Sequence, residues 1–124
     1  MKEAISSPAA PKAVGPYSQG IRAGGLLFVA GQIALDAAGN MVNGDVARQA
    51  RQVLDNVRAI LATGGLTMND VVRTTVYLSD MNDLAAMNQV YGEYFSEPFP
   101  ARATVQVARL PRDVRIEIEV MAAY

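Results

Sequence analysis

Apolar and polar residues alternate along two segments in the last quarter of the chain, residues 101–107 and 114–120. Successive side chains of a strand point to opposite faces of a sheet, so each segment is expected to form a strand with one apolar face. A short turn that contains Pro111 joins them. If the two strands pair, an arginine of the first and a carboxylate of the second can converge.

A helical pattern occupies the middle of the chain, over residues 46–63. Asp45 is a suitable N-cap, and Gly64-Gly65 supplies a stop. The apolar residues recur at helical spacing and predict one buried face. They are Ala50, Val53, Leu54, Val57, Ile60 and Leu61.

A second helix is expected from an N-cap at Asp80 through Phe95, ended by Pro98 and Pro100. Leu84, Met87, Tyr91 and either Tyr94 or Phe95 form its predicted buried stripe.

Three further strands are expected, two before the first helix and one between the two helices. Residues 71–78 alternate and are rich in β-branched residues. Residues 26–30 form a continuous apolar run between glycines, which predicts a strand buried on both faces. Residues 20–23 can pair with that run as a hairpin, whereas residues 6–16 read as an irregular arm.

The predicted order of strands, helix, strand, helix and two strands favours an α+β fold with two helices on one face of a mixed sheet. The length of 124 residues suits a single domain, residues 1–124. Two helices leave the second sheet face uncovered, and Ala30, Met121 and Ala123 would lie there. That face is expected to be either an interface or an ordinary solvent-exposed amphipathic surface.

The amino-acid composition limits the kinds of partner and reaction that the chain can have. Eleven basic and twelve acidic residues give a formal charge of −1, which does not favour nucleic acid as a partner. The chain has no cysteine and no histidine, so thiol nucleophiles, histidine bases and metal sites built on either residue are excluded. The sequence has neither a membrane-spanning run nor a signal-peptide pattern, so a cytoplasmic protein is expected.

Four ordered motifs resemble the Rid family, also called YjgF or L-PSP, along almost the whole chain. They are Gly15-Pro16-Tyr17-Ser18-Gln19-Gly20, Ala30-Gly31-Gln32-Ile33, Ala50-Arg51-Gln52-Val53-Leu54-Asp55-Asn56, and Pro100-Ala101-Arg102 through Ile116-Glu117-Ile118-Glu119. The family consists of deaminases that hydrolyse enamine and imine products of pyridoxal-phosphate enzymes. The resemblance implies a chorismate-mutase-like fold and a homotrimer with active sites in clefts between subunits.

The resemblance also implies a site. The family's substrate-carboxylate arginine falls on Arg102 and its water-activating glutamate on Glu117. The positions that line the family's pocket fall on Tyr17, Gly31, Asn88 and Thr104. Ala30 stands where the family frequently has serine, which removes one hydrogen bond from the implied pocket. Without the family, Arg102 would read as a surface ion-pair partner and Glu117 as a solvated strand residue.

The implied reaction is hydrolysis of 2-iminopropanoate or 2-iminobutanoate to a 2-oxo acid and ammonia, with no metal and no cofactor. A guanidinium binds a planar carboxylate bidentately, and a glutamate can take a proton from water. Two other classes stay open: a trimeric protein that binds small carboxylates or acts as a chaperone, and an endoribonuclease. The absence of histidine and of a basic stripe argues against the ribonuclease.

Overall fold

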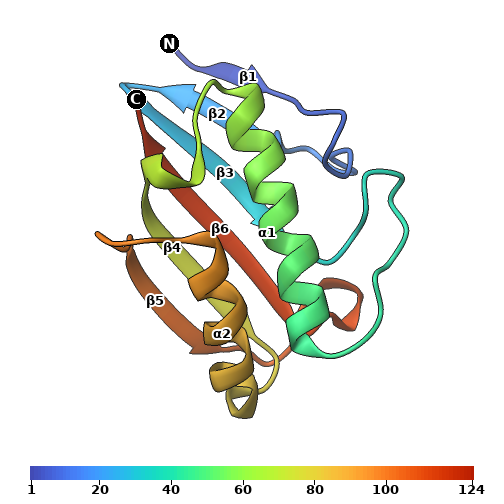
Figure 1. Ribbon diagram of the computed structural model, residues 1–124. Coiled ribbons are helices and arrows are strands. Elements are labelled where there is room, and N and C mark those ends of the chain that lie inside the picture. The colour runs from blue at the N-terminus through green and yellow to red at the C-terminus, as the bar shows by residue number, and fades with distance from the viewer.

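The computed structural model describes all residues, 1–124, and contains one six-stranded mixed sheet in the order β1-β2-β3-β6-β4-β5 (Figure 1). Neighbouring strands are antiparallel except β4 and β5, which are parallel. The strands are β1 (Glu3–Ile5), β2 (Gly20–Ala23), β3 (Leu26–Gln32), β4 (Val71–Leu78), β5 (Ala101–Gln106) and β6 (Ile116–Ala123). The sequence analysis missed β1, which pairs with β2 at the sheet edge.

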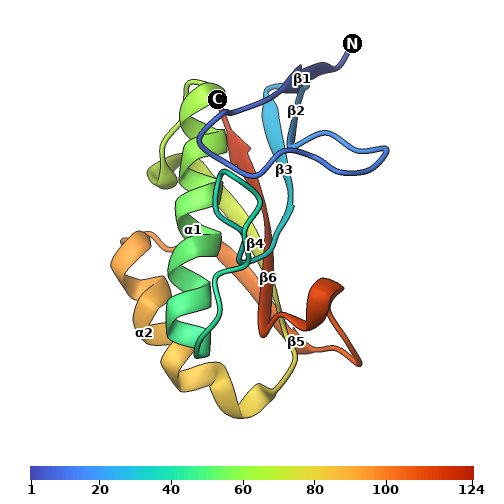
Figure 2. The same ribbon diagram turned by 90° about the vertical axis from the view of Figure 1, so that its right-hand side faces the viewer.

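Two helices, α1 (Val46–Thr63) and α2 (Leu84–Tyr94), cover one face of the sheet and leave the other without a helix (Figure 2). The bounds of α1 are those predicted: the Asp45 carboxylate accepts a hydrogen bond from the Arg48 amide, and Gly64 follows the last turn. The two-residue stop is completed by Gly65, whose φ of +83° is a left-handed conformation that favours glycine.

The second helix starts later than predicted. Asp80 caps a short 3-10 turn, η2 (Met81–Asp83), by accepting from the Asn82 amide, and α2 proper runs from Leu84 to Tyr94. Its buried residues are Met87, Val90 and Tyr91, with Phe95 buried just beyond its end. An Asp N-cap signal therefore marked a 3-10 turn that leads into the helix.

The core lies between the helices and the sheet. All six residues of the predicted α1 stripe are buried, and they join Ile116, Ile118 and Val120 of β6 in one apolar cluster. Each fully buried leucine, isoleucine or valine contributes about 1.5–3 kcal/mol through removal from water. The helices are thus held to this face by apolar contact.

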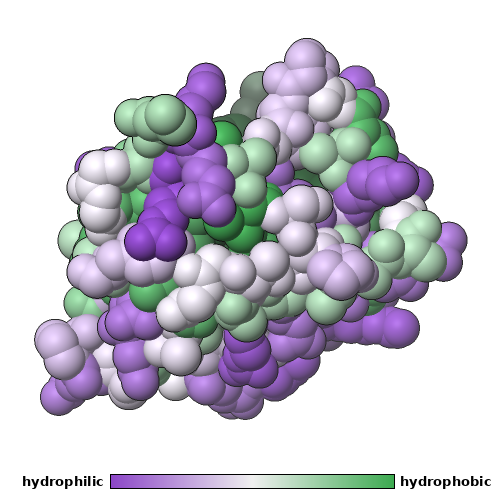
Figure 3. All heavy atoms as spheres, turned by 90° about the horizontal axis from the view of Figure 1, so that it is seen from above, coloured by the Kyte–Doolittle hydropathy of each residue, from purple (hydrophilic) through white to green (hydrophobic).

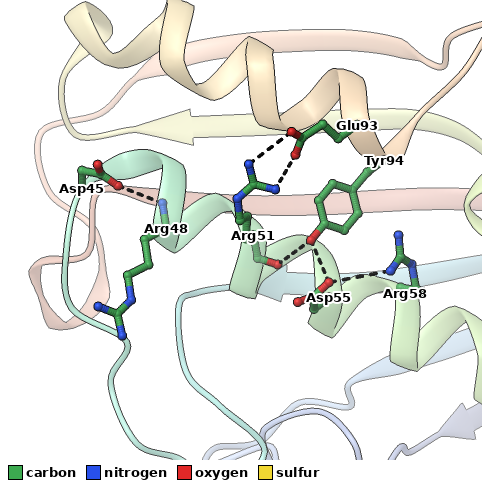
Figure 4. A network of polar contacts seen from close by, with 7 residues as sticks. All are labelled: Asp45, Arg48, Arg51, Asp55, Arg58, Glu93 and Tyr94. Carbon is green, nitrogen blue, oxygen red and sulfur yellow. Dashed lines mark hydrogen bonds and ion pairs between the residues drawn. The ribbon is translucent and has the colours of Figure 1, made fainter.

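A polar network on the outer side ties the two helices together (Figure 4). The Arg51 guanidinium forms a two-pronged ion pair with the Glu93 carboxylate of α2. The Tyr94 hydroxyl donates to Asp55 at 2.7 Å, and burial is the main cause that raises the pKa of Tyr94 to about 12. Such exposed pairs add little free energy but fix the relative position of α1 and α2.

The two C-terminal strands do not pair, so the condition under which their arginine and carboxylate could converge is not met. β4 lies between β5 and β6, parallel to the first and antiparallel to the second. The helix α2 carries the chain from the end of β4 back to the start of β5, and such a crossover produces a parallel pair. The segment after β5, with the short turn η3 (Pro111–Asp113), then leads the chain to the far side of β4.

The strand β3 is buried on one face only, so the prediction of burial on both faces is wrong for the single chain. Leu27 and Val29 are buried, whereas Phe28 is 40% exposed. The opposite face of the sheet has no α-helix, and it leaves Val105, which pairs with Tyr77, exposed as well. We call this helix-free surface the open face.

No helix is long and apolar enough to cross a membrane. The end of the molecule seen in Figure 3 is hydrophilic over much of its rim, with hydrophobic atoms visible in hollows between polar side chains. No single hydrophobic patch covers that end (Figure 3).

Candidate active site

A cavity of about 790 Å³ lies beside Glu117 and is lined by three of the predicted site residues, Tyr17, Gly31 and Glu117. Its walls come from the arm that precedes β2, the loop that follows β3 and the turn η3. Figure 2 shows the arm and η3 protruding on the side of the sheet away from the helices. The cavity therefore belongs to the open face.

The buried side chain of Gln19 fixes the arm. It accepts from the Ser7 amide at 2.6 Å and donates to the Pro11 carbonyl at 2.8 Å. These bonds replace the secondary structure that a proline-rich segment lacks. Tyr17 and the arm's part of the cavity wall are held in place by this single amide.

Gly31 has a steric role beside Glu117. A β-bulge interrupts the pairing of β3 with β6 between Val29 and Gln32, and Gly31 lies in this bulge. A Cβ at Gly31 would come within 2.1 Å of the Glu117 Oε2 atom. Only glycine lets the carboxylate lie against this part of the backbone.

Gly31→Ala is expected to lower the kcat of a reaction that depends on Glu117 about 10- to 100-fold, because the methyl group displaces the Glu117 carboxylate by about an ångström or more. Steady-state kinetics with circular dichroism would measure the effect in a folded variant. Gly92→Ala is the matched control, since nothing lies within 4 Å of a Cβ there. Equal activity of the two variants would contradict the role given to Gly31.

The electrostatic surroundings of Glu117 favour its protonated form. Burial raises the pKa of the half-buried Glu117, and the negative charge of Glu119 raises it further. No side chain hydrogen-bonds to the Glu117 carboxylate, whereas Glu119 accepts from the Tyr77 hydroxyl at 2.6 Å. A carboxylate with a raised pKa is a stronger base toward a bound water.

The other three predicted residues lie elsewhere, around strand β5 and helix α2. The Arg102 guanidinium is 4.8 Å from the centroid of the Tyr91 ring, and Arg102 makes no ion pair within the chain. The Thr104 Oγ1 atom is buried without a hydrogen-bond partner. Asn88 is exposed on α2, one turn before Tyr91.

The two groups of residues lie on opposite faces of the sheet. Arg102 pairs with Thr74, whose hydroxyl bonds to Tyr91 of α2, so its side chain is on the helix-covered face. Glu117 follows the buried Ile116 and points to the open face. Within one chain, the arginine and the carboxylate do not converge, because β4 separates their strands.

Sequence reasoning missed two cations of the cavity, Lys12 and Arg112. Two other arginines near η3 have partners within the chain: Arg109 pairs with Asp113, and Arg115 donates to the Gly44 carbonyl. Arg112 makes no ion pair and has a left-handed φ of 56°. The sequence alone held no signal for that backbone conformation.

No group of three or more histidine, cysteine, aspartate and glutamate residues is placed to hold a metal ion.

Comparison with known proteins identifies the family. The family model described as endoribonuclease L-PSP matches residues 7–124. A RutC family protein of Pyrococcus horikoshii is 58% identical over 123 residues, covering 98% of each chain. The 2-iminobutanoate/2-iminopropanoate deaminase of Escherichia coli is 48% identical over 125 residues, again with 98% of both chains covered.

The fold agrees with this assignment. The crystal structure of the YjgF gene product of Escherichia coli superposes with a TM-score of 0.92 at 48% identity, covering 98% of each chain. Together with the cavity beside Glu117 and the six-stranded sheet, these matches show that the chain belongs to the YjgF/L-PSP family of Rid-type proteins.

Proposed function

We propose that this protein hydrolyses 2-imino acids such as 2-iminopropanoate and 2-iminobutanoate to 2-oxo acids and ammonia. The observation that carries the proposal is the half-buried Glu117, set against Gly31 in an open cavity and free of hydrogen bonds to other side chains. The name of the Escherichia coli relative, 2-iminobutanoate/2-iminopropanoate deaminase, supports this choice of substrate.

In the proposed reaction, Arg102 binds the substrate carboxylate and orients the C=N carbon toward a water beside Glu117. Glu117 takes a proton from the water while the oxygen forms a bond to that carbon. Return of this proton to the nitrogen completes the carbinolamine. Its hydroxyl group then passes its own proton through Glu117 to the amino group, which becomes the leaving group as the C=O bond forms. The C–N bond then breaks, and ammonia and the 2-oxo acid are released. Positioned acid–base catalysis of this kind contributes ~10²–10⁴-fold.

The same proposal requires a second copy of the chain. Arg102, Asn88 and Thr104 lie around the β5 edge, while Tyr17, Gly31 and Glu117 lie on the open face. A neighbouring copy that packs on the open face can bring its Arg102 group to the Glu117 cavity. It would also cover Phe28 and Val105, which are exposed in one chain. A homotrimer would contain three such sites.

The experiment that tests the activity generates 2-iminobutanoate with a pyridoxal-phosphate dehydratase and traps the remaining imine with semicarbazide. Wild-type protein should suppress the trapping, and Arg102→Ala should not. Arg48→Ala, which removes an exposed arginine of α1, is the matched control and should behave like wild type. Unchanged trapping with wild-type protein would overturn the proposed activity.

The description of the matched family model favours endoribonuclease activity as a second candidate. A general base exists in Glu117, but the chain has no histidine and a net charge of −1. Such a chain offers little counterion release to an RNA backbone. Cleavage of a labelled RNA by wild type that disappears in Glu117→Gln would support this second candidate.

A further inference from the structure

Two glutamates of β6, Glu117 and Glu119, lie on the same face of the strand, roughly 7 Å apart along it. The two glutamates differ in how they contact Tyr77 of β4. Tyr77 lies directly opposite Glu117 in the register, yet its hydroxyl donates to Glu119 at 2.6 Å. Glu117 is half-buried, whereas Glu119 is exposed.

From this arrangement we propose that Tyr77 and Glu119 are positioning residues for Glu117: the hydrogen bond from Tyr77 fixes the Glu119 carboxylate beside Glu117, and the negative charge of Glu119 strengthens Glu117 as the base that takes the proton of the water. The proposal rests on the proposed imine hydrolysis and deepens its site. Neither Tyr77 nor Glu119 touches the substrate in this scheme.

The charges around Glu117 come from four parts of the chain. The arm supplies Lys12 and Tyr17, and η3 supplies Arg112, all on the cavity wall. On β4, Tyr77 faces Glu117, and Arg73 lies farther along the same strand. Glu119 is the neighbouring charge on β6 itself.

Burial and Glu119 both disfavour the ionised Glu117, as the raised pKa of Glu117 reflects. The bond from Tyr77 to Glu119 in turn raises the pKa of Tyr77, which keeps the phenol protonated as a donor. In the proposed reaction the proton moves from water to Glu117 and on to the imine nitrogen.

Glu119→Gln tests the proposal, because it keeps an acceptor for Tyr77 and removes the charge. The titration midpoint of the Glu117 carboxyl, followed by carboxyl-carbon NMR, should move to lower pH. The ratio of kcat/KM at about pH 5 to that at about pH 8 should rise about two- to fivefold. Glu3→Gln, an equal charge change at the exposed strand β1, is the control and should move neither readout.

An unmoved midpoint in Glu119→Gln would overturn the proposal. The NMR titration needs no turnover, so it separates two failures: a shifted midpoint in a protein without imine hydrolysis would refute only the proposed function. Tyr77→Phe keeps the charge and removes the donor. Without that hydrogen bond the Glu119 carboxylate is no longer fixed beside Glu117, so the Glu117 midpoint should move toward lower pH, and an unmoved midpoint would overturn the role of Tyr77.

Discussion

Replacing Glu117 by glutamine is expected to lower kcat for 2-iminobutanoate by ~10²–10⁴-fold while leaving substrate binding nearly unchanged. Glutamine fits the space beside Gly31 but cannot accept a proton from water. Single-turnover kinetics and calorimetric titration with a 2-oxo acid product would separate the two effects. A protein that only binds small carboxylates would show the retained binding and no turnover in either form.

Whether the Glu117→Gln variant is folded can be checked from its melting temperature, and the raised pKa of Glu117 gives the expected sign of the difference from wild type. Burial and Glu119 raise the pKa of Glu117 in the folded chain, so the stability that the protonated group provides is lost as pH rises through that pKa. Glutamine stays neutral, and the variant should therefore melt no lower than wild type near neutral pH. Turnover retained in a folded Glu117→Gln protein would remove the general-base role.

Arg102→Ala is expected to lower kcat/KM about 100-fold through loss of carboxylate binding and orientation. The sharper result comes from mixing it with Glu117→Gln. If Glu117 and Arg102 of one site come from two copies, subunit exchange creates sites in which both residues are intact. Equal mixing should restore about a quarter of the wild-type activity, since one pairing in four joins the two intact halves.

The matched controls mix wild type with Arg102→Ala in one sample and with Glu117→Gln in another. These two mixtures give the reference for dilution of the wild-type activity. Activity that stays absent after verified subunit exchange would mean that one copy must supply both residues, or that Arg102 is not part of the site. Since Arg102 and Glu117 lie on opposite faces of the sheet in one chain, restoration is the outcome expected here.

The helix α1 shows what local sequence can predict. Its cap at Asp45, its apolar stripe and its glycine stop are all set by residues within a few positions of one another. The helix-covered face of β6 followed equally well, because Ile116, Ile118 and Val120 alternate with polar residues and are buried. The spacing of apolar residues and the helix caps were sufficient to predict these elements.

The local sequence could not predict which strands lie next to each other. Alternation shows which side chains share a face but does not show which strand lies alongside, and β4 lies between the segments 101–107 and 114–120. The relation between Glu117 and Arg102 depended on the same unknown, since the two side chains could converge within one chain only if their strands paired. Tyr17, Gly31 and Glu117 do line one cavity, but the proximity of Tyr77 to Glu119 depends on the β4–β6 register.

The central place of β6 also has a consequence for the order of folding. This strand follows every other strand in the chain, yet it lies in the middle of the sheet and joins β1-β2-β3 to β4-β5. During synthesis, the two inner edges on β3 and β4 stay unpaired until residues 116–123 leave the ribosome. Unpaired apolar edges are where nascent chains associate wrongly, so this topology delays completion of the sheet and prolongs the exposure of those edges.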